Sequence, residues 1–281
     1  MIYAIGDIHG QKDMLDHALA LIAADGGDDA RIVFLGDYTD RGPDSRGVLD
    51  TLIAGQKAGR DWVFIRGNHD EMFHDFIVAG KENDSNVKSG ISWINKRLGG
   101  ITTLASYGIS GDAHFLHPSG GGLETLASYA VGTDSLTSDE LRKRAARSVP
   151  KRHLNFLKTL PHVYITHDLL FVHAGIRPGE PIDDQDPNDL IWIRDGWLDD
   201  TRDHGRLVVH GHTALEHPQH YGNRVNLDGG AGYGHPLIPA VFAGRDCWLL
   251  TDPGRVPLLP PADMGLARHM AHSLTTLRDL I

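Results

Sequence analysis

The chain has 281 residues, 41% hydrophobic and 23% charged, which is the composition of a folded globular protein and excludes a disordered chain. Its formal net charge of -10 argues against the phosphate backbone of a nucleic acid as the main partner, because like charges repel. Its single cysteine, Cys247, excludes an internal disulfide and favours a reducing compartment.

The first 80 residues alternate strand-like apolar runs with helix-like segments. Three strand and helix pairs are expected, at residues 2–5 and 13–24, 31–35 and 46–58, and 62–66 and 71–79. Such a βαβα series is typical of a largely parallel sheet with helices on its faces. In sheets of this kind, ligands gather at the carboxyl ends of the strands.

Residues 80–165 interrupt this series. Two stretches are loops by composition, 81–90 and 110–122, and two helices are expected over 138–160, divided at Pro150. We interpret the segment as a helical cap inserted at the edge of the sheet. Within it, GGITTLASYG at 99–108 is nearly repeated as GGLETLASYA at 121–130. A local duplication of one turn-and-helix unit is our interpretation, and a paired recognition element over the site is the alternative.

The second half of the chain predicts short strands with few helices between them, at 169–175, 206–212, 224–230, 237–244 and 247–252. We expect these strands to form a second sheet that packs on the first. The expected fold is α/β, a sandwich of two mixed β-sheets flanked by helices. Residues 1–281 are expected to form a single domain, with the cap inserted at about 80–165.

Neither a membrane nor a secretory route is expected. No apolar stretch approaches the roughly 20 residues that span a bilayer. The first strand-like run begins at Ile2, which leaves no room for the basic and apolar regions of a signal peptide. We therefore expect a cytoplasmic protein.

Five short segments carry the recognisable chemistry. Each lies at the end of an apolar run and supplies Asp, His or Asn: GDIHG at 6–10, GDYTDRG at 36–42, GNHD at 67–70, HAG at 173–175 and HGHT at 210–213. Carboxylate, imidazole and amide oxygen together suit borderline divalent ions such as Mn, Fe, Zn or Ni. Any one segment alone is typical of a turn, but the five together indicate a site for two adjacent metal ions.

Chemistry alone suggests roles for several of these side chains. Asp7 and His9 stand two residues apart at an extended strand end, so they can point the same way and share one ion. Asp37, from a second strand end, can bridge two ions. The amide oxygen of Asn68 can ligate without adding charge, and it places His69 beside the ions as a proton donor for a leaving oxygen.

Two arginines are candidates for holding phosphate. Guanidinium groups meet phosphate oxygens in pairs, which is the role we expect for Arg41 in GDYTDRG and Arg194 in IWIRDGW. The alternative for Arg194 is a partly buried side chain that covers the aromatic faces of Trp192 and Trp197. We interpret His210 as structural.

The order of the five motifs resembles the phosphoprotein phosphatase family of the calcineurin-like metallophosphoesterases, especially its bacterial and bacteriophage branch. The resemblance spans residues 2 to about 243. It implies a first metal held by Asp7 and His9, a bridging Asp37, and a second metal held by Asn68, His173 and His212. It also implies substrate contacts and acid catalysis from Arg41, Arg194, Asn68 and from His69 oriented by Asp40.

The activity implied is hydrolysis of phosphomonoesters in proteins, as a serine/threonine phosphatase that could also accept phosphotyrosine. The expected mechanism is direct attack by a hydroxide held between the two ions, without a phosphoenzyme. Manganese is the expected metal, with iron, zinc and nickel as alternatives. The expected partner is a phosphoprotein or phosphopeptide, without a dedicated regulatory subunit.

Two other functions are kept as alternatives. A symmetrical dinucleoside tetraphosphate hydrolase would share the fold and the metals. A catalytically inactive binding relative is disfavoured, because such proteins usually lose a ligand or the acid and every motif residue is present here. A phosphodiesterase is also disfavoured, since Ala214 stands where a GHxH motif would place its second histidine.

Overall fold

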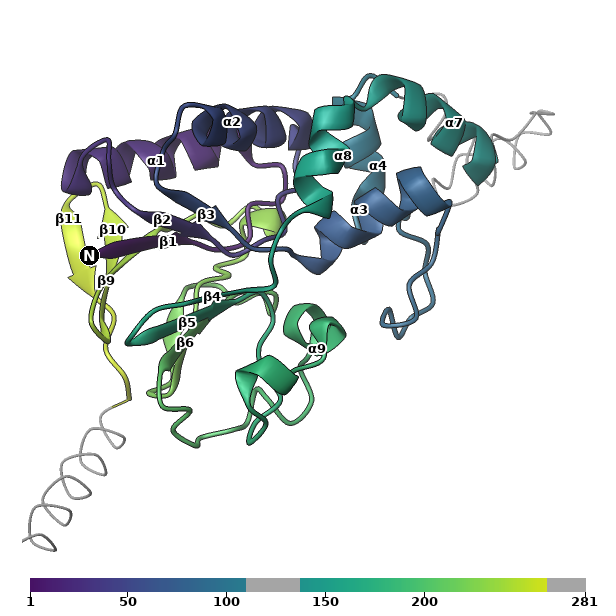
Figure 1. Ribbon diagram of the computed structural model, residues 1–281. Helices are drawn as coiled ribbons and strands as arrows, with labels where there is room; N and C mark the ends of the chain where they lie inside the picture. The colour runs from purple at the N-terminus through teal and green to yellow at the C-terminus, as the bar shows by residue number, and fades with distance from the viewer. Residues whose placement is uncertain (110–136, 262–281) are drawn as a thin grey trace, which may run out of the picture.

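The computed structural model describes residues 1–109 and 137–261. Two β-sheets lie face to face, with helices on the outer side of the pair (Figure 1). The expected α/β sandwich of two mixed sheets is therefore confirmed. The second copy of the near-repeat, residues 121–130, and the loop expected at 110–122 lie outside the described residues.

The first sheet has the strand order β11-β10-β9-β1-β2-β3. As the sequence predicts, β1, β2 and β3 run parallel, whereas β9, β10 and β11 extend the sheet beyond β1 through antiparallel pairs. The bounds are Ile2–Ile5 for β1, Ile32–Phe34 for β2, Trp62–Phe64 for β3, Ala240–Ala243 for β9, Asp246–Thr251 for β10 and Gly254–Pro257 for β11.

The second sheet has the order β4-β5-β6-β8-β7. Its central strands β5, β6 and β8 are parallel, and β4 and β7 pair antiparallel at its two edges. The bounds are Val163–Ile165 for β4, Leu169–Val172 for β5, Leu207–His210 for β6, Gln219–His220 for β7 and Arg224–Asn226 for β8. Both sheets thus contribute parallel strands whose carboxyl ends can meet.

Strand alternation explains how one chain fills three apolar layers. In β5, Leu169 and Phe171 face the core between the sheets, while Leu170 and Val172 face the outer layer under α9. The same alternation turns Ala4 of β1 toward the second sheet and its neighbours toward the helices. Burial on both faces accounts for the continuous apolar runs of these strands.

The helices divide into two sets. Of the helices within the described residues, six share one apolar core with the first sheet: α1 (Lys12–Gly26), α2 (Ser45–Lys57), α3 (Asn68–Ala79), α4 (Gly100–Ser106), α7 (Ser138–Ser148) and α8 (Lys151–Lys158). The second sheet is covered by α9 (Pro187–Trp192), and short 3-10 turns occur at Ile182–Asp184 and Ala231–Tyr233. None of the helices in the described ranges has the length and apolarity that a bilayer crossing requires.

The segment between α3 and β4 contains the two helices expected on either side of Pro150. α7 ends at Ser148, and α8 begins at Lys151 directly after the proline, which suits the entry of a helix. α7 and α8 both pack on α3, so the helices of this segment gather at one end of the first sheet (Figure 1).

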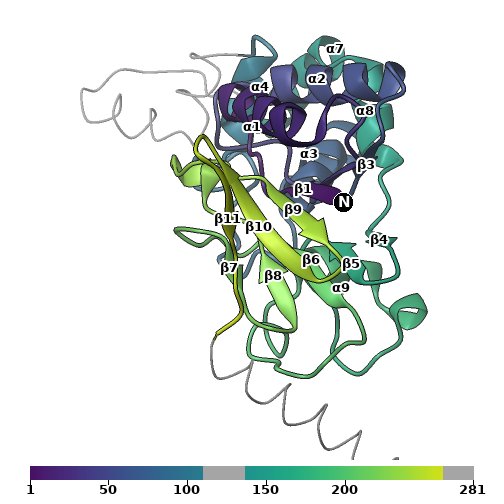
Figure 2. The same ribbon diagram turned by 90° about the vertical axis from the view of Figure 1, so that its left-hand side faces the viewer.

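Two strand assignments from the sequence are wrong. Residues 237–244 and 247–252 were expected in the second sheet, but β9 and β10 join the first sheet beside β1 (Figure 2). The reason is that β9 is apolar on both faces: Phe242 enters the core between the sheets and Val241 enters the core under the helices. Such a strand fits either sheet, and pairing with the open edge of β1 decides its place.

The third helix begins earlier than expected. α3 starts at Asn68 and not at residue 71, so the GNHD segment forms its first turn. The Asp70 carboxylate accepts a hydrogen bond from the Gly67 N–H at 3.2 Å and from the Tyr38 N–H at 2.9 Å, which satisfies an otherwise free backbone donor at the helix start. Asn68 and His69 are therefore fixed on a helix terminus.

Candidate active site

The five motifs meet where the carboxyl ends of the central strands of both sheets converge. The loops after β1, β2, β5 and β6 and the first turn of α3 each contribute side chains. The side chains predicted as metal ligands are all buried: Asp7, His9, Asp37, Asn68, His173 and His212. We refer to these six residues as the donor cluster.

One half of the donor cluster is built around Asn68. Its Oδ1 lies 2.9 Å from His173 Nε2 and 2.9 Å from His212 Nδ1. His173 Nδ1 donates to the Leu35 carbonyl at 2.8 Å, which leaves Nε2 with a lone pair. Among the described residues, that lone pair faces the acceptors Asn68 Oδ1 and, at 3.5 Å, Asp37 Oδ1. A cation bound between these acceptors would pair all of them.

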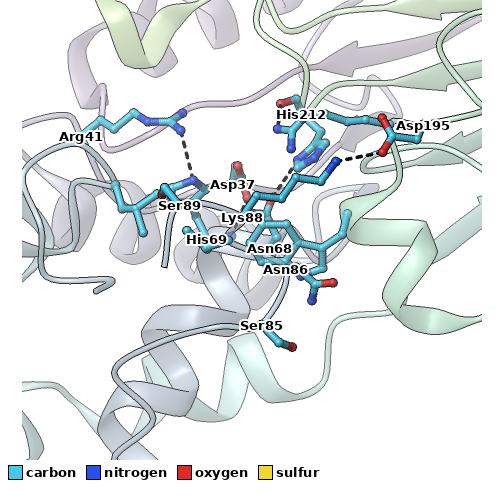
Figure 3. A pocket seen from close by; sticks show the side chains of 14 residues that line it. Asp37, Arg41, Asn68, His69, Ser85, Asn86, Lys88, Ser89, Asp195 and His212 are labelled. Atoms are coloured by element: carbon cyan, nitrogen blue, oxygen red, sulfur yellow. Dashed lines mark hydrogen bonds and ion pairs between the residues drawn. The ribbon is translucent and has the colours of Figure 1, made fainter. Parts of the chain in front are cut away.

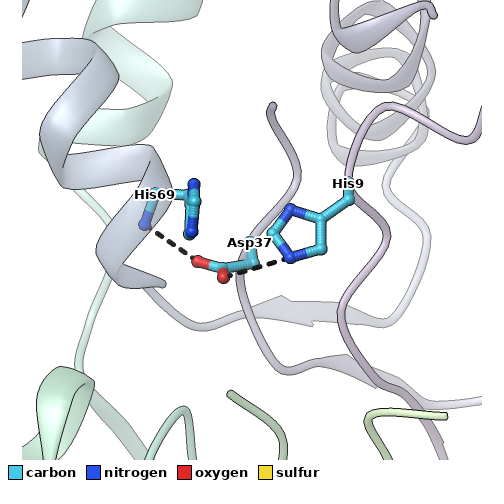
Figure 4. Close-up of side chains that lie close together, drawn as sticks. All are labelled: His9, Asp37 and His69. Atoms are coloured by element: carbon cyan, nitrogen blue, oxygen red, sulfur yellow. Dashed lines mark hydrogen bonds and ion pairs between the residues drawn. The ribbon is translucent and has the colours of Figure 1, made fainter. Parts of the chain in front are cut away.

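The other half is built around His9 and Asp7. His9 Nδ1 donates to the Thr39 carbonyl at 2.9 Å, so its Nε2 is turned toward Asp37 Oδ2 at 3.5 Å (Figure 4). Asp7 is oriented by the His212 N–H, which lies 3.1 Å from both carboxylate oxygens. Asp37 belongs to two groups of mutually close donor atoms, one with His9 and His69 and one with Asp7 and His173.

The electrostatics of the donor cluster fit divalent cations. Burial, followed by the charges of Asp228 and Asp37, raises the pKa of Asp7 well above its usual range. Burial lowers the pKa values of His9 and His212, so both imidazoles are neutral and free to ligate. Carboxylate, neutral imidazole and amide oxygen form a donor set that borderline divalent ions accept. The residues present therefore fit a pair of such ions.

His69 and Asp40 form a buried dyad beside the donor cluster. His69 Nδ1 lies 2.6 Å from Asp40 Oδ2, and Trp93 Nε1 and Thr103 Oγ1 donate to the same carboxylate at 2.8 and 2.7 Å. Burial lowers the pKa of His69 to about 3, opposed by the charge of Asp37, and burial raises the pKa of Asp40 to about 7. The dyad fixes the ring so that Nε2 is directed away from Asp40.

Arg41 and Arg194 both line a cavity of about 520 Å³ that is also lined by Asp37, Asn68 and His212 of the donor cluster (Figure 3). The Arg41 guanidinium contacts His9 Nε2 and lies 3.1 Å from His69 Nε2, and Tyr233 stacks under it with its ring centre 4.8 Å away. Arg194 donates to the His212 carbonyl at 3.4 Å. Both cations are thus directed at the same space.

The sequence left one structural alternative for Arg194 and gave a structural interpretation for His210. Among the described residues, the guanidinium that covers Trp197 is that of Arg224, 5.4 Å from the ring centre, and not that of Arg194. His210 is buried outside the donor cluster, with Nδ1 3.0 Å from the Gly211 carbonyl and its ring against Trp197.

The backbone of the motifs is strained. Within residues 1–109 and 137–261, the non-glycine residues with positive φ all belong to the motifs: His9, Asp37, Asp40, Arg41 and His212. Such conformations cost of order 1–3 kcal/mol each and persist where the surroundings impose them, often at functional sites. Close packing also explains the glycine in GNHD, because a Cβ on Gly67 would lie 2.2 Å from Asp37 Oδ1.

The structure adds residues that the sequence analysis missed. Asp228 follows β8, is buried, and accepts a hydrogen bond from the Gly230 N–H at 3.0 Å. Its charge raises the pKa of Asp7, so it lies close enough to influence the donor cluster. The signal was available, since Asp228 follows a strand expected from the sequence, as the motif residues do. Trp93 and Thr103 come from the inserted helical segment and carried no such signal.

These features accord with comparisons to known proteins. The chain belongs to the calcineurin-like phosphoesterase family, whose model matches residues 1–243. It is thus a hydrolase of the metallophosphoesterase class, a class that works with divalent metals. The broader resemblance seen in the sequence is confirmed, whereas its narrower form, the phosphoprotein phosphatases, is not confirmed, because the curated relatives are named as tetraphosphatases.

Among curated proteins, the chain is similar to asymmetrical bis(5'-nucleosyl)-tetraphosphatases named PrpE. The protein of Anoxybacillus flavithermus is 25% identical over 84% of this chain and 89% of its own length. The protein of Bacillus subtilis is 26% identical over 73% of each chain.

Among solved structures, a protein inferred to be a diadenosine tetraphosphatase has a TM-score of 0.57 and 22% identity, covering 92% of this chain and 94% of its own. A cold-active protein-tyrosine phosphatase of Shewanella has a TM-score of 0.51 and 15% identity, covering 92% of this chain and 80% of its own. At these identities, the two structures demonstrate a shared fold and nothing finer.

Proposed function

We propose that the protein hydrolyses dinucleoside tetraphosphates in a metal-dependent reaction. The observation that carries the proposal is the similarity to three tetraphosphatases along most of their length, together with a donor cluster in which every motif side chain is present. This replaces protein phosphatase, our first expectation from the sequence, with the alternative that the sequence left open. The relatives' name also favours asymmetrical over symmetrical cleavage.

For the metal centre, we propose that Asp37 bridges two ions. Its two oxygens support this role, since Oδ2 lies 3.5 Å from His9 Nε2 and Oδ1 lies 3.5 Å from His173 Nε2. Asp7 and His9 would hold the first ion, and Asn68, His173 and His212 the second. When bound, such ions neutralise charge on phosphoryl oxygens and lower the pKa of water. Manganese remains our proposed metal, with iron, zinc and nickel as alternatives.

The remaining motif residues would bind the substrate and handle its protons. Arg41 and Arg194 face the cavity and would neutralise the oxygens of the phosphoryl group under attack. His69 would act as the acid in its protonated form: Nδ1 donates to Asp40, and a second proton at Nε2, which burial opposes and the charge of Asp37 favours, would pass to the leaving oxygen. A leaving phosphate has a pKa of only about 6, so proton donation matters less for a polyphosphate than for a serine ester.

The products of diadenosine tetraphosphate test the proposal. After incubation with the metal-loaded enzyme, chromatography separates the nucleotides. AMP with ATP identifies asymmetrical cleavage, two ADP identify symmetrical cleavage, and a chelated sample gives the background. Phosphoserine, phosphothreonine and phosphotyrosine peptides at equal concentration form the second arm. Turnover of peptides with no nucleotide products would overturn the proposal.

Protein phosphatase activity is the second candidate, because the GDYTDRG segment has the form found in phosphoprotein phosphatases. It predicts the opposite outcome in the same experiment, namely phosphate release from peptides with diadenosine tetraphosphate intact. The fold does not distinguish the two, since a tyrosine phosphatase and a tetraphosphatase both superpose on it.

A further inference from the structure

We propose that Lys88 is a specificity-determining residue that binds the phosphates beyond the one under attack, so that the site favours a polyphosphate chain over a phosphomonoester. The inference rests on the proposed function and names the part of the protein that would recognise the rest of the substrate. It concerns the outer wall of the cavity, for which the motifs assign no role.

The outer wall is formed by the loop that follows α3. Residues 85–89 of this loop line the same cavity as Asp37, Arg41 and His69. Except for Val87, the side chains of these five residues are polar or charged: Ser85, Asn86, Lys88 and Ser89. In Figure 3 the Lys88 side chain runs across the pocket toward Asp195, on the opposite wall next to Arg194. A chain of phosphates leaving the donor cluster would pass along this wall.

The ion pair that Lys88 makes can be exchanged for a ligand. Lys88 Nζ lies 2.9 Å from Asp195 Oδ2, and the two side chains are 86% and 88% exposed. Pairs this exposed contribute little, because water screens both charges. A phosphate oxygen in the cavity offers Lys88 an equivalent partner with more negative charge. The carboxylate of Asp195, by contrast, would repel a phosphate bound beside Lys88.

The loop does not depend on that ion pair for its position. Asn86 and Asn188 of α9 form reciprocal amide hydrogen bonds at 2.9 and 3.2 Å, which tie the loop to the opposite wall. Asp84, on the same loop, accepts from the Asn86 N–H at 2.9 Å and from Lys81 at 2.6 Å. Lys88 is therefore carried by a fixed loop, and its ammonium group remains available.

Charge balance favours such a residue. The chain is strongly acidic overall, and a tetraphosphate adds several negative charges to a site already rich in carboxylates. Arg41 and Arg194 can neutralise the phosphoryl group next to the donor cluster, but the following phosphates lie farther out. Lys88 brings positive charge to that outer region, whereas a phosphopeptide carries no second phosphate to meet it.

Three variants test the inference: Lys88→Gln, Asp195→Asn and the control Lys143→Gln. Lys143 also makes an exposed ion pair, 2.6 Å from Asp139, but it lies on α7 and outside the described residues that line the cavity. The readout is the ratio of kcat/KM for diadenosine tetraphosphate to kcat/KM for p-nitrophenyl phosphate. Lys88→Gln should lower this ratio about tenfold, through KM, by loss of one charge-assisted contact to phosphate. Asp195→Asn should raise it, and Lys143→Gln should leave it unchanged.

A binding measurement separates this inference from the proposed function. Inorganic triphosphate and inorganic phosphate are compared as inhibitors of p-nitrophenyl phosphate hydrolysis at constant free metal. Lys88→Gln should weaken inhibition by triphosphate about tenfold more than inhibition by phosphate. Equal weakening, no weakening, or a fall in the substrate ratio for Asp195→Asn as well would overturn the role of Lys88. A wild-type enzyme that yields no nucleotide products would instead overturn the proposed function.

Discussion

Asp37 faces potential ligands on both sides, and its backbone is held at a positive φ of 52° in a turn that buries it completely. No other carboxylate among the described residues belongs to both groups of close donor atoms. Its side chain also accepts a hydrogen bond from the His69 N–H at 2.9 Å, which links the donor cluster to the helix that carries the proposed acid. The centre therefore depends on this single residue more than on any ligand at its edge.

We predict that Asp37→Asn loses metal from both positions, because a neutral side chain cannot offset the charge of two cations. Metal content measured after desalting should fall from about two ions per chain to below one, and kcat/KM should fall at least about a hundredfold. The control is Asp61→Asn, an exposed carboxylate paired with Arg31. Full metal content in Asp37→Asn would contradict the assignment of Asp37 as the bridging ligand.

For His69, the prediction depends on the leaving group. His69→Asn should lower kcat by roughly 10²- to 10⁴-fold for a serine phosphate, the usual scale of general acid catalysis, with metal content unchanged. The loss should be smaller for p-nitrophenyl phosphate and diadenosine tetraphosphate, whose leaving groups need little protonation. Asp40→Asn should give a milder form of the same pattern. Equal losses on all three substrates would exclude His69 as the acid.

At the residue scale, the sequence predicts best the side chains that follow a strand. The motif residues do so, and the structure brings them together because parallel strands of both sheets end at one edge. Trp93 and Thr103 could not be predicted, since they reach Asp40 from an inserted helical segment whose packing depends on tertiary contacts. The role of Lys88 could not be predicted from the sequence either, because no pattern distinguishes one lysine in a polar loop from another.

Among the elements, α8 has an unusual attachment. His153 of α8 is fully buried, with Nε2 3.0 Å from Asp50 Oδ1 of α2 and Nδ1 2.7 Å from the hydroxyl of Tyr107, which follows α4. In the neutral ring, Nε2 donates to Asp50 and Nδ1 accepts from Tyr107. Burial lowers the pKa of His153, opposed by Asp50. The neutral side chain of His153 thus links α8 to α2 and to the residue that follows α4.

We predict a pH-dependent loss of stability from this attachment. Below its ordinary pKa of about 6.5, unfolded His153 takes up a proton that the folded ring resists, so stability is complete above pH 6.5 and falls as the pH drops. Urea midpoints at pH 7.5 and 5.5 should differ less for His153→Gln than for the wild type. The exposed His167 supplies the control variant His167→Gln, which should behave as the wild type. An unchanged pH dependence in His153→Gln would contradict the assignment.

The sequence predicted most elements but misplaced β9 and β10. Strand–helix alternation determines a parallel sheet over the first 80 residues, so β1 to β3 were assigned correctly. For β9, apolar residues on both faces predict a central strand, but they do not predict which strand it pairs with. Pairing of Tyr3 with Val241 is a contact between distant parts of the chain, and the local pattern contains no information about it.

In the whole molecule, the donor cluster lies at the seam between the two sheets. Asp7, His9, Asp37 and Asn68 come from the first sheet and its helices, while His173 and His212 follow strands of the second. In the absence of cations, burial raises the pKa values of Asp7 and Asp228, and the negative charge of Asp37 raises both further. Cations at the seam would therefore stabilise the packing of one sheet on the other.

Metal loading should accordingly raise the melting temperature. A ligand present at 100 times its Kd adds about 2.7 kcal/mol, which corresponds to roughly 5 °C for a chain of this size. Differential scanning calorimetry with a divalent ion and with a chelator measures the difference. Asp37→Asn should show a much smaller shift. An equal melting temperature of the wild type with the divalent ion and with the chelator would argue against cations at the seam.

The pairing of β1 with β9 has a consequence for biosynthesis. β1 leaves the ribosome long before Ala240–Ala243, the strand that covers its outer edge, because most of the described residues lie between the two strands in the sequence. Throughout that interval the nascent chain exposes an apolar strand with unpaired N–H and C=O groups, the kind of edge that pairs with other chains. The N-terminal half can form its parallel strands early, but the open edge of β1 can pair with other chains until β9 has been synthesised. We therefore expect the nascent chain to need chaperones that protect this edge from aggregation.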